Sequence, residues 1–331
     1  MKFLCLFALT AAVGISVVAL APAQAQETRI FVDGLGHEVE IPVKPKRIVS
    51  LRGEQFTAPL VEMGAPIVAS VGDVVEGVND GRPVIRGAYE LFHTTFENSD
   101  IAFVGTTHQP DVEAIAALKP DLILVPDFAA ENYSRYSVVA PTVVIKIWSN
   151  PARERYRRIA DATGMLDAFE RLANLYDFRL GEARHLIEEE GIDAQDIVVA
   201  VAEVNGKRLR VFKHYDAMTA VLSDLGFSRP EVVDGLNGER LDLSPEQLQS
   251  IDGDFLVSSY SERRFSGPSE LRANWDNLIP GWDAFLHAPR HNQHILIPRE
   301  IMRALSFRAL EEVLAIYMSN IVTRKFVPFE D

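Results

Sequence analysis

Cysteine is nearly absent from the sequence: the only one among 331 residues, Cys5, lies in the apolar segment at the amino terminus. A chain without that segment has no thiol, which excludes disulfides and thiolate-bound metals. Cys5 also does not stand at the end of the apolar segment, where the acceptor of a lipid anchor would stand. We therefore expect a thiol-free protein suited to an oxidising compartment such as a bacterial periplasm.

Positive charge is also scarce. The chain holds 33 Lys and Arg against 47 Asp and Glu, for a formal net charge of −14. So acidic a chain is a poor candidate for binding nucleic acid or an anionic membrane surface, and it has no long basic run. Any anion that it binds must meet positive charge gathered locally.

The common sequence signatures of catalytic sites are missing as well. There is no GxxxxGK[ST] phosphate loop, no GxSxG elbow and no HExxH pair. His287, His291 and His294 resemble metal-ligand spacing, but Pro289 interrupts a helical presentation, and we interpret them as surface histidines in a loop. The sequence predicts no catalytic residues and no metal site.

The amino terminus has the pattern of a secretory signal. Met1-Lys2 precedes a nearly continuous apolar run, and Ala23-Gln24-Ala25 has the small-x-small form that a signal peptidase cleaves. The run is long enough to cross a membrane, but the cleavage pattern favours a signal peptide over residues 1–25. We expect the mature protein to begin near Gln26 and to be periplasmic.

Strand and helix patterns alternate after this segment, beginning with a hairpin around Asp33-Gly34. Such alternation favours an α/β fold with parallel sheets covered by helices. Expected strands are 47–51, 67–70, 101–104, 122–125 and 142–147, then 197–202, 209–212, 255–258 and 295–298. Expected helices are 54–63, 111–118, 130–138, 216–225 and 302–323.

Between the two sets of strands, a stretch of some 40 residues from Pro151 has helical period. Its apolar positions between Met165 and Glu190 fall on one stripe, and only Gly164 and Gly181 interrupt the pattern. At 1.5 Å per residue this part would be roughly 39 Å long, enough to span two lobes. We therefore divide the chain into a first lobe (26–150), a linking helical segment (151–191) and a second lobe (192–331).

The two lobes share a local pattern of helix, tight turn and buried strand, at 110–125 and 244–258. Glu113, Ile115, Leu118 and Asp121 have the same mutual spacings as Glu246, Leu248, Ile251 and Asp254. This repeat predicts two similar lobes.

Arginine and aromatic residues follow several of the expected strands. The carboxyl ends of parallel strands form one rim of a sheet, so these side chains should face a cleft between the lobes. Singly, each arginine could be a solvated ion pair; together they favour an anionic, partly aromatic ligand. The candidate ligand-binding residues are Arg52, Arg86, His108 and Phe128 in the first lobe and Tyr215, Tyr260, Arg263 and Arg303 in the second. Arg299 follows the same expected strand as Arg303 but is not among the chosen candidates.

Several stretches resemble one known family, the periplasmic substrate-binding proteins of ABC importers for ferric siderophores, heme and cobalamin. The resemblance rests on "VDGLGHEVEIPVKPKRIVSL", "VGTTHQPDVEAIAALKPDLILV", "LSDLGFSRPE" and "LSPEQLQSIDGDFLV". It implies a class III binding protein, with two α/β lobes joined by one long helix and little hinge motion. It also implies a ligand held between the lobes and no catalysis.

The resemblance further implies a monomer that captures an anionic ferric siderophore and delivers it to a permease dimer in the inner membrane. Heme or cobalamin is the alternative ligand; an exported enzyme or a sensor partner is less favoured. In this family, exposed acids on the two lobes dock onto permease arginines. Glu131 matches the position in the first lobe, and Glu262 or Glu270 is the counterpart in the second, of which we choose Glu270.

Overall fold

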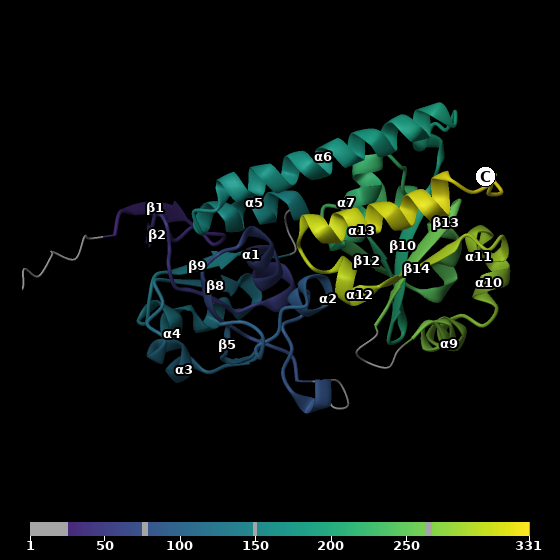
Figure 1. Cartoon of the computed structure of the whole chain (residues 1–331). Helices are drawn as coiled ribbons and strands as arrows, with labels where there is room; N and C mark the ends of the chain where they lie inside the picture. Colours follow the sequence, from purple (N-terminus) through teal and green to yellow (C-terminus); the bar gives the residue numbers. More distant parts are fainter. Residues whose placement is uncertain (1–25, 75–78, 148–150, 262–266, 331) are drawn as a thin grey trace, which may run out of the picture.

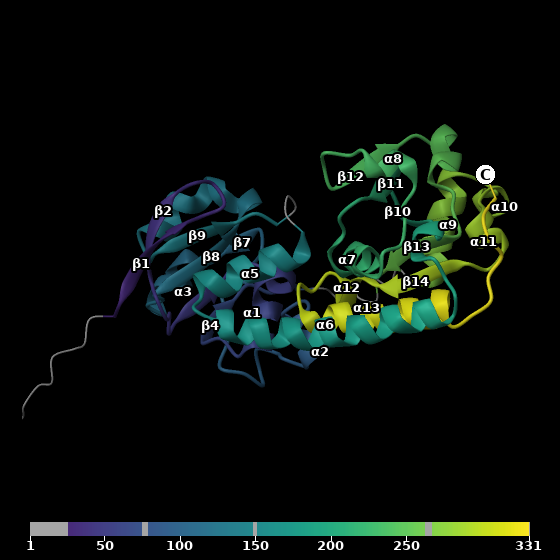
Figure 2. The same ribbon diagram turned by 90° about the horizontal axis from the view of Figure 1, so that it is seen from above.

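The computed structural model describes residues 26–74, 79–147, 151–261 and 267–330. Two α/β lobes lie side by side, and helix α6 (Leu166–Glu189) runs along both (Figure 1). The view from above shows α13 (Phe307–Tyr317) beside the second-lobe part of α6 (Figure 2). The expected signal peptide with Cys5, and also Glu262 and Arg263, lie outside the described residues. Within the described ranges, no helix combines the length and apolar character needed to span a bilayer.

The first lobe contains a five-stranded sheet in which every strand pair is parallel, as the alternating pattern predicts. The interior strands β3 and β8 and the edge strand β9 are buried along their whole length, as expected for a parallel sheet covered on both faces. In sheet order the strands are β5 (Ala102–Phe103), β4 (Ile67–Ser70), β3 (Ile48–Ser50), β8 (Leu122–Pro126) and β9 (Thr142–Ile145). The helices around this sheet are α1 (Ala58–Met63), α2 (Ala88–Phe92), α3 (Val112–Ala117) and α4 (Tyr133–Ser137).

The predicted hairpin, β1 (Thr28–Val32) and β2 (Glu38–Pro42), is joined to this sheet through its turn. The buried carboxylate of Asp33 accepts backbone N–H bonds from His37 at 2.9 Å and from Val144 of β9 at 3.1 Å. Gly34 N–H donates to the Val144 carbonyl at 2.7 Å, an approach that leaves little room for a side chain at position 34. The hairpin therefore extends the first lobe.

The linking segment consists of two helices, where one continuous run was expected. Helix α5 (Ala152–Ala162) ends before Gly164, which has φ +68°, and α6 starts at Leu166. A Cβ at Gly164 would collide with the Val43 carbonyl oxygen, so glycine is required by both conformation and space. Gly181, in contrast, does not interrupt α6. The predicted apolar stripe of α6 is confirmed, since Phe169, Tyr176 and Leu180 are buried.

The second lobe has a mixed five-stranded sheet. Strands β10, β13 and β14 are parallel, but β11 runs antiparallel to β10, and β12 is antiparallel to β11. The carboxyl end of β11 therefore lies at the opposite edge from those of β10 and β13, against the expectation of a single rim. In sheet order the strands are β12 (Arg240–Leu243), β11 (Arg208–Phe212), β10 (Val199–Asn205), β13 (Phe255–Tyr260) and β14 (His294–Pro298).

Short and medium helices complete the described part of the second lobe. The expected closing helix is divided into α12 (Arg299–Met302), α13 and a π-helical turn, Met318–Val322. The helices are α7 (Asp216–Leu225), α8 (Glu231–Asp234), α9 (Pro268–Leu278), α10 (Trp282–Phe285), α11 (His287–Arg290), α12 (Arg299–Met302) and α13.

The predicted repeat between the lobes corresponds to an equivalent set of hydrogen bonds. Asp121, just before β8, accepts the backbone N–H groups of Lys46 at 2.7 Å and Arg47 at 2.8 Å, at the start of β3. Asp254, just before β13, accepts the N–H of Val198 at 2.7 Å, at the start of β10. In each lobe an aspartate thus anchors the neighbouring parallel strand.

A continuous core joins the lobes. The ring of Phe307, at the start of α13, lies 5.1 Å from that of Tyr156 in α5 and 5.4 Å from that of Phe169 in α6. Beside them, Glu62 of α1 accepts hydrogen bonds from Tyr156 Oη at 2.7 Å and from the backbone N–H groups of Phe307 at 2.9 Å and Arg308 at 2.7 Å. The first lobe thus caps a helix of the second, which fixes their mutual position.

Candidate ligand-binding site

Arg52 lies directly after β3, where the chain enters the π-helical turn Gly53–Thr57 that leads into α1. Its carbonyl oxygen accepts the N–H of Thr57 at 2.9 Å. Its guanidinium donates to Gln55 Oε1 at 2.6 Å and to Glu54 Oε2 at 3.0 Å, and it lies 5.6 Å from the ring centre of Phe128. Arg52 is therefore held at the cleft by two neighbours in its own turn.

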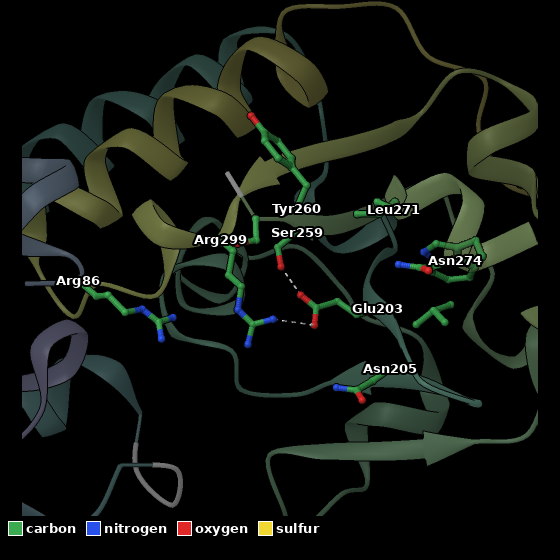
Figure 3. A pocket seen from close by; sticks show the side chains of 11 residues that line it. Arg86, Glu203, Asn205, Ser259, Tyr260, Leu271, Asn274 and Arg299 are labelled. Carbon is green, nitrogen blue, oxygen red and sulfur yellow. Dashed lines mark hydrogen bonds and ion pairs between the residues drawn. The ribbon is translucent and has the colours of Figure 1, made fainter. Parts of the chain in front are cut away.

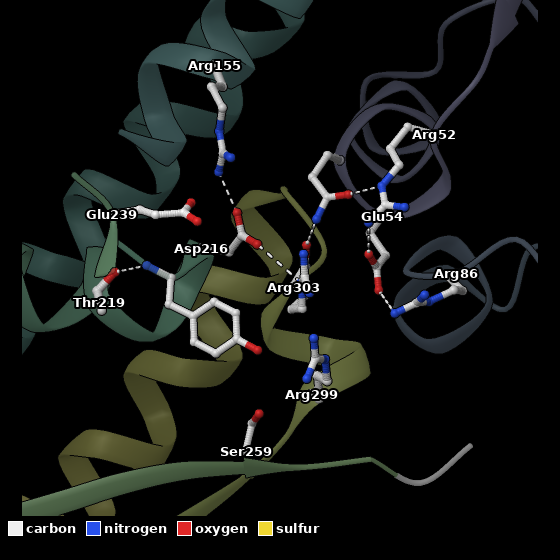
Figure 4. A network of polar contacts seen from close by, with 12 residues as sticks. Arg52, Glu54, Arg86, Arg155, Asp216, Thr219, Glu239, Ser259, Arg299 and Arg303 are labelled. Carbon is white, nitrogen blue, oxygen red and sulfur yellow. Dashed lines mark hydrogen bonds and ion pairs between the residues drawn. The ribbon is translucent and has the colours of Figure 1, made fainter. Parts of the chain in front are cut away.

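Glu54 is the centre of a buried ion cluster in the first lobe (Figure 4). Arg86 forms an ion pair with it, and Arg86 also lies 3.0 Å from Asp73. Burial would raise the pKa of Glu54, but the guanidinium groups of Arg86, Arg303 and Arg52 outweigh it and hold the pKa at about 2. Glu54 is therefore a permanent anion that neutralises several arginines.

Asp216 plays the corresponding part in the second lobe. Its carboxylate forms an ion pair with Arg155 of α5 and lies 3.7 Å from Arg303 Nε (Figure 4). Asp216 begins α7 with φ +42°, in the left-handed region that a non-glycine residue seldom adopts. The ion pairs of the buried carboxylate provide a reason for this strain.

Tyr215 presents an aromatic surface between two arginines. One face stacks on Phe212 at 4.0 Å between ring centres, and the guanidinium groups of Arg303 and Arg299 lie 5.6 Å and 5.9 Å from its own ring centre. Burial raises the pKa of Tyr215, so its phenol stays protonated. β11 runs antiparallel to β10, so its carboxyl end lies at the other edge of the sheet. Tyr215, three residues after β11, packs back onto Phe212, and this contact keeps its ring beside the arginines.

A cavity of about 150 Å³ lies beside these groups, and Arg86 and Arg299 are the two of them that line it (Figure 3). Arg86 lines it from the first lobe, and the other lining side chains come from the second lobe. Glu203 accepts a hydrogen bond from Ser259 and lies 3.8 Å from Arg299. A smaller hollow, lined by Arg52, Glu54 and Arg86 among others, adjoins it through Arg86.

The structure brings most of the predicted ligand-binding residues to this region. Arg52, Arg86, Tyr215 and Arg303 belong to the contacts above, and Tyr260 lines the cavity. His108 and Phe128 are exposed at its first-lobe side, with ring centres 6.3 Å apart. Arg263 lies outside the described residues. The role of these residues in binding stays a prediction.

The two described docking candidates are both exposed. Glu131 lies in the short helical turn Asp127–Asn132 that leads into α4, and Glu270 lies in the first turn of α9. Helices α4 and α9 belong to different lobes, and both lie on the side of the molecule away from α6 (Figure 1). This placement is compatible with a single partner surface that spans both lobes.

Several residues of the site were not singled out from the sequence. Glu203 had a usable signal, since it is a lone charge within the apolar run of β10. Glu54 and Asp216 had none, because an acid at the start of a helix is ordinary. Two other residues of the ion clusters, Asp73 and Arg155, were also not singled out from the sequence.

The histidines of "HAPRHNQH" differ from the expected surface loop. His287 is buried and its Nε2 lies 2.8 Å from the Val327 carbonyl oxygen, while His294 begins β14 with Nε2 3.0 Å from Ser258 Oγ. His291 lies beside His287, with ring centres 4.4 Å apart, while His294 contacts Trp282 instead, with ring centres 5.4 Å apart. Across the part of the chain that the structure describes, no group of three or more His, Cys, Asp and Glu could hold a metal ion.

Comparison with known proteins gives a consistent picture. The family model described as "Periplasmic binding protein" matches residues 84–284. "Probable siderophore-binding lipoprotein YfiY" of Bacillus subtilis is 27% identical over 70% of this chain and 68% of its own length. The ferric enterobactin-binding periplasmic protein FepB of Escherichia coli is 25% identical over 74% of this chain and 76% of its own.

Solved structures share the fold. Staphylococcus aureus SirA, crystallised with staphyloferrin B, superimposes with a TM-score of 0.71 at 20% identity, covering 89% of this chain and 98% of SirA. The FhuD protein from S. pseudintermedius superimposes with a TM-score of 0.67 at 17% identity, covering 90% and 99%. The predicted architecture of two α/β lobes and one long helix is thereby confirmed.

Proposed function

Because the chain belongs to the periplasmic binding protein family, we propose that it captures an anionic ferric siderophore in the cleft between its lobes. It would then deliver the chelate to the permease of an ABC importer. The relatives in the comparison carry names of siderophore-binding proteins, and one structural neighbour is titled a component of a ferrichrome ABC transporter. The proposed role is binding without chemical conversion.

One observation supports this ligand class above the others: arginine and tyrosine side chains from both lobes meet at a polar cavity. Among the cleft arginines that the structure describes, Arg299 is the most available to a ligand, because its side chain is 32% exposed and its ion-pair partner there, Glu203, is 3.8 Å away. Arg303 and Tyr215 lie beside it. A guanidinium fork and a flat aromatic face suit the oxygen-rich, planar groups that chelate ferric iron.

Heme and cobalamin fit this cavity less well. Heme needs an apolar slot and an axial ligand, whereas the cavity of about 150 Å³ is lined by Arg86, Glu203 and Arg299 among other polar residues. Tyr215, the most enclosed tyrosine of the cluster, is buried and protonated, which makes it a poor ligand for heme iron. These properties favour an iron chelate with its own oxygen ligands.

A ligand panel tests the proposal directly. Calorimetric titration of the purified mature protein with ferrioxamine B, ferric enterobactin, ferric citrate, hemin and cyanocobalamin should give one-to-one binding, at micromolar concentration or below, to ferric enterobactin or ferric citrate, the two anionic ferric chelates. Binding of ferrioxamine B (a cation), hemin or cyanocobalamin alone would replace the proposed ligand class. Binding of none of the five would contradict the proposal.

The proposed place of action is the periplasm, in keeping with the family membership: one relative is named a periplasmic protein and another a lipoprotein. We propose that residues 1–25 are removed during export and that the mature monomer comprises lobes 26–150 and 192–331 with the linking segment 151–191. Amino-terminal sequencing of protein secreted by its own host should read Gln26 or a neighbouring residue. An intact Met1 would contradict the cleavage.

Docking on the permease is proposed to use Glu131 and Glu270. Reversing either charge, Glu131→Arg or Glu270→Arg, should lower cellular uptake of the ferric chelate by roughly tenfold or more, since like charges would meet across the interface. The chelate affinity of the purified variants should be unchanged, because both acids are exposed and neither lines the cavity.

The matched control is Glu182→Arg, an exposed acid on α6. Because α6 lies on the side of the molecule away from α4 and α9, this reversal should leave uptake intact (Figure 1). Normal uptake by both docking variants would exclude these acids from the permease contact.

A further inference from the structure

Helix α9 forms one wall of the inter-lobe cavity and carries a buried donor at an unusual place. Trp275 has 0% exposure and lines the cavity, yet its Nε1 has no hydrogen-bond partner among the residues that the structure describes. Its neighbour Trp282, with a ring centre 4.6 Å away, donates from Nε1 to Asp276 Oδ1 at 3.0 Å. The indole N–H of Trp282 thus has an acceptor, whereas that of Trp275 has none among the described residues.

A buried indole N–H almost always finds an acceptor, because desolvation without one is costly. Trp275 packs against Trp282 on one side and borders the cavity on the other. An acceptor atom placed in the cavity would complete its hydrogen bonding. The unpaired N–H thus points to an acceptor group of a bound molecule.

The part of the cavity near Trp275 differs from the part near the arginines. Asn205, at the end of β10, and Asn274, on α9, lie on the side away from Arg86 and Arg299 (Figure 3). Their amides, like the indole, are uncharged hydrogen-bonding groups. We call Asn205, Asn274 and Trp275 the neutral wall.

The neutral wall selects for the charge of what it binds. A carboxylate placed against two amides and an indole would lose water without gaining a cation. A neutral carbonyl oxygen loses much less solvation and accepts a hydrogen bond from the same donors. The wall therefore suits an amide or hydroxamate carbonyl better than a further anionic group.

We propose that the neutral wall receives an uncharged carbonyl-bearing arm of the ferric siderophore, with Trp275 Nε1 donating to that carbonyl. The inference rests on the proposed function and narrows its ligand to chelates with amide or hydroxamate carbonyls, as opposed to compact polycarboxylates. The cavity of about 150 Å³ has room for an arm, and the charged groups of the chelate lie toward Arg86 and Arg299.

The test compares two kinds of ferric chelate by calorimetry. Ferrioxamine B and ferric enterobactin carry amide or hydroxamate carbonyls, and ferric citrate carries only carboxylate and hydroxyl groups. Wild type should bind ferric enterobactin, the anionic chelate of the first kind, more tightly than ferric citrate. Trp275→Phe, which keeps an aromatic ring and removes the N–H, should weaken that binding by about tenfold and leave ferric citrate unchanged.

Two further variants separate binding from folding. Asn274→Leu changes an exposed position on the same wall and should weaken the same chelate severalfold with an unchanged melting temperature. Trp282→Phe alters the stacked indole that does not line the cavity, so any effect should be on stability alone.

Other outcomes would overturn either the role of the neutral wall or the proposed function. Unchanged affinity in Trp275→Phe and Asn274→Leu, or an equal loss for all chelates, would exclude the neutral wall from carbonyl recognition. A wild type that prefers ferric citrate would also overturn the inference while leaving the proposed function intact. A wild type that binds no ferric chelate would contradict the proposed function itself.

Discussion

Replacing Glu54 with glutamine should lower the free energy of unfolding by roughly 3–5 kcal/mol, the usual cost of removing one member of a buried ion cluster. Glu54 is 1% exposed and pairs with Arg52 and Arg86, while Arg303 lies near enough to lower its pKa. Glutamine has the same shape but no charge, so these buried guanidinium groups would lose their common counterion.

The same carboxylate predicts a dependence of stability on acid. The pKa of Glu54 falls from its ordinary value of 4.5 to about 2 in the folded protein, since the arginines outweigh the effect of burial. Its stabilising contribution is therefore complete above pH 4.5 and is lost as the pH falls from about 4.5 to about 2, with a total on the order of 3 kcal/mol.

Chemical denaturation at pH 7, 5, 4 and 3 measures both effects. The gap between wild type and Glu54→Gln should narrow below pH 4.5, because protonated Glu54 and glutamine carry the same charge. Glu97→Gln is the matched control, an acid whose side chain is 42% exposed and 3.8 Å from Arg82, and it should change stability little. A Glu54→Gln protein as stable as wild type at pH 7 would show that the arginines do not depend on this anion.

Replacing Arg299 with methionine should weaken ferric chelate binding by about tenfold to a hundredfold, the usual worth of a charge-assisted hydrogen bond. Arg299 lines the cavity, lies over Tyr215, and pairs with Glu203 at 3.8 Å within the described part of the chain. Methionine keeps the length of the side chain and removes the donors. Arg52→Ala should also weaken binding, but less, because Arg52 is engaged by Gln55 and Glu54.

Calorimetric titration with the chelate that wild type prefers measures both variants. Arg240→Met serves as control, since Arg240 pairs with Glu239 on the edge strand β12 and does not line the cavity. Equal affinities for wild type and Arg299→Met would remove Arg299 from the site. A larger loss in Arg52→Ala would reverse the ranking of the two arginines.

Much of the fold was predictable because its signals are local. The strand and helix periods of the first lobe, the Asp33-Gly34 turn and the stripe on α6 each depend on a few neighbouring residues. The direction of β11 had a local signal too: Gly206 and Lys207 form a two-residue hairpin turn between β10 and β11, and two residues cannot form a parallel crossover. The strand–helix alternation along the rest of the chain favoured parallel strands throughout, so this signal was not used.

The site was predictable in its residue types and less so in its connections. Arg52, Arg86 and Arg303 stand out as arginines after strands or helical turns. Which acid neutralises which arginine depends on contacts between residues far apart in sequence, such as Arg155 with Asp216. The sequence also does not show which tryptophan lacks an acceptor, because that depends on the packing of α9 against β10 and β13.

The core shared by the two lobes has a kinetic consequence. With Phe307 packed on Tyr156 and Phe169, and with Glu62 capping α13, any change in the angle between the lobes would have to break these contacts, and we expect ligand entry without one. Association should then be limited by diffusion and orientation, and ligands of different affinity should differ in how long they stay bound. On that basis, the permease would have to increase the dissociation rate of the chelate from the binding protein in order to receive it.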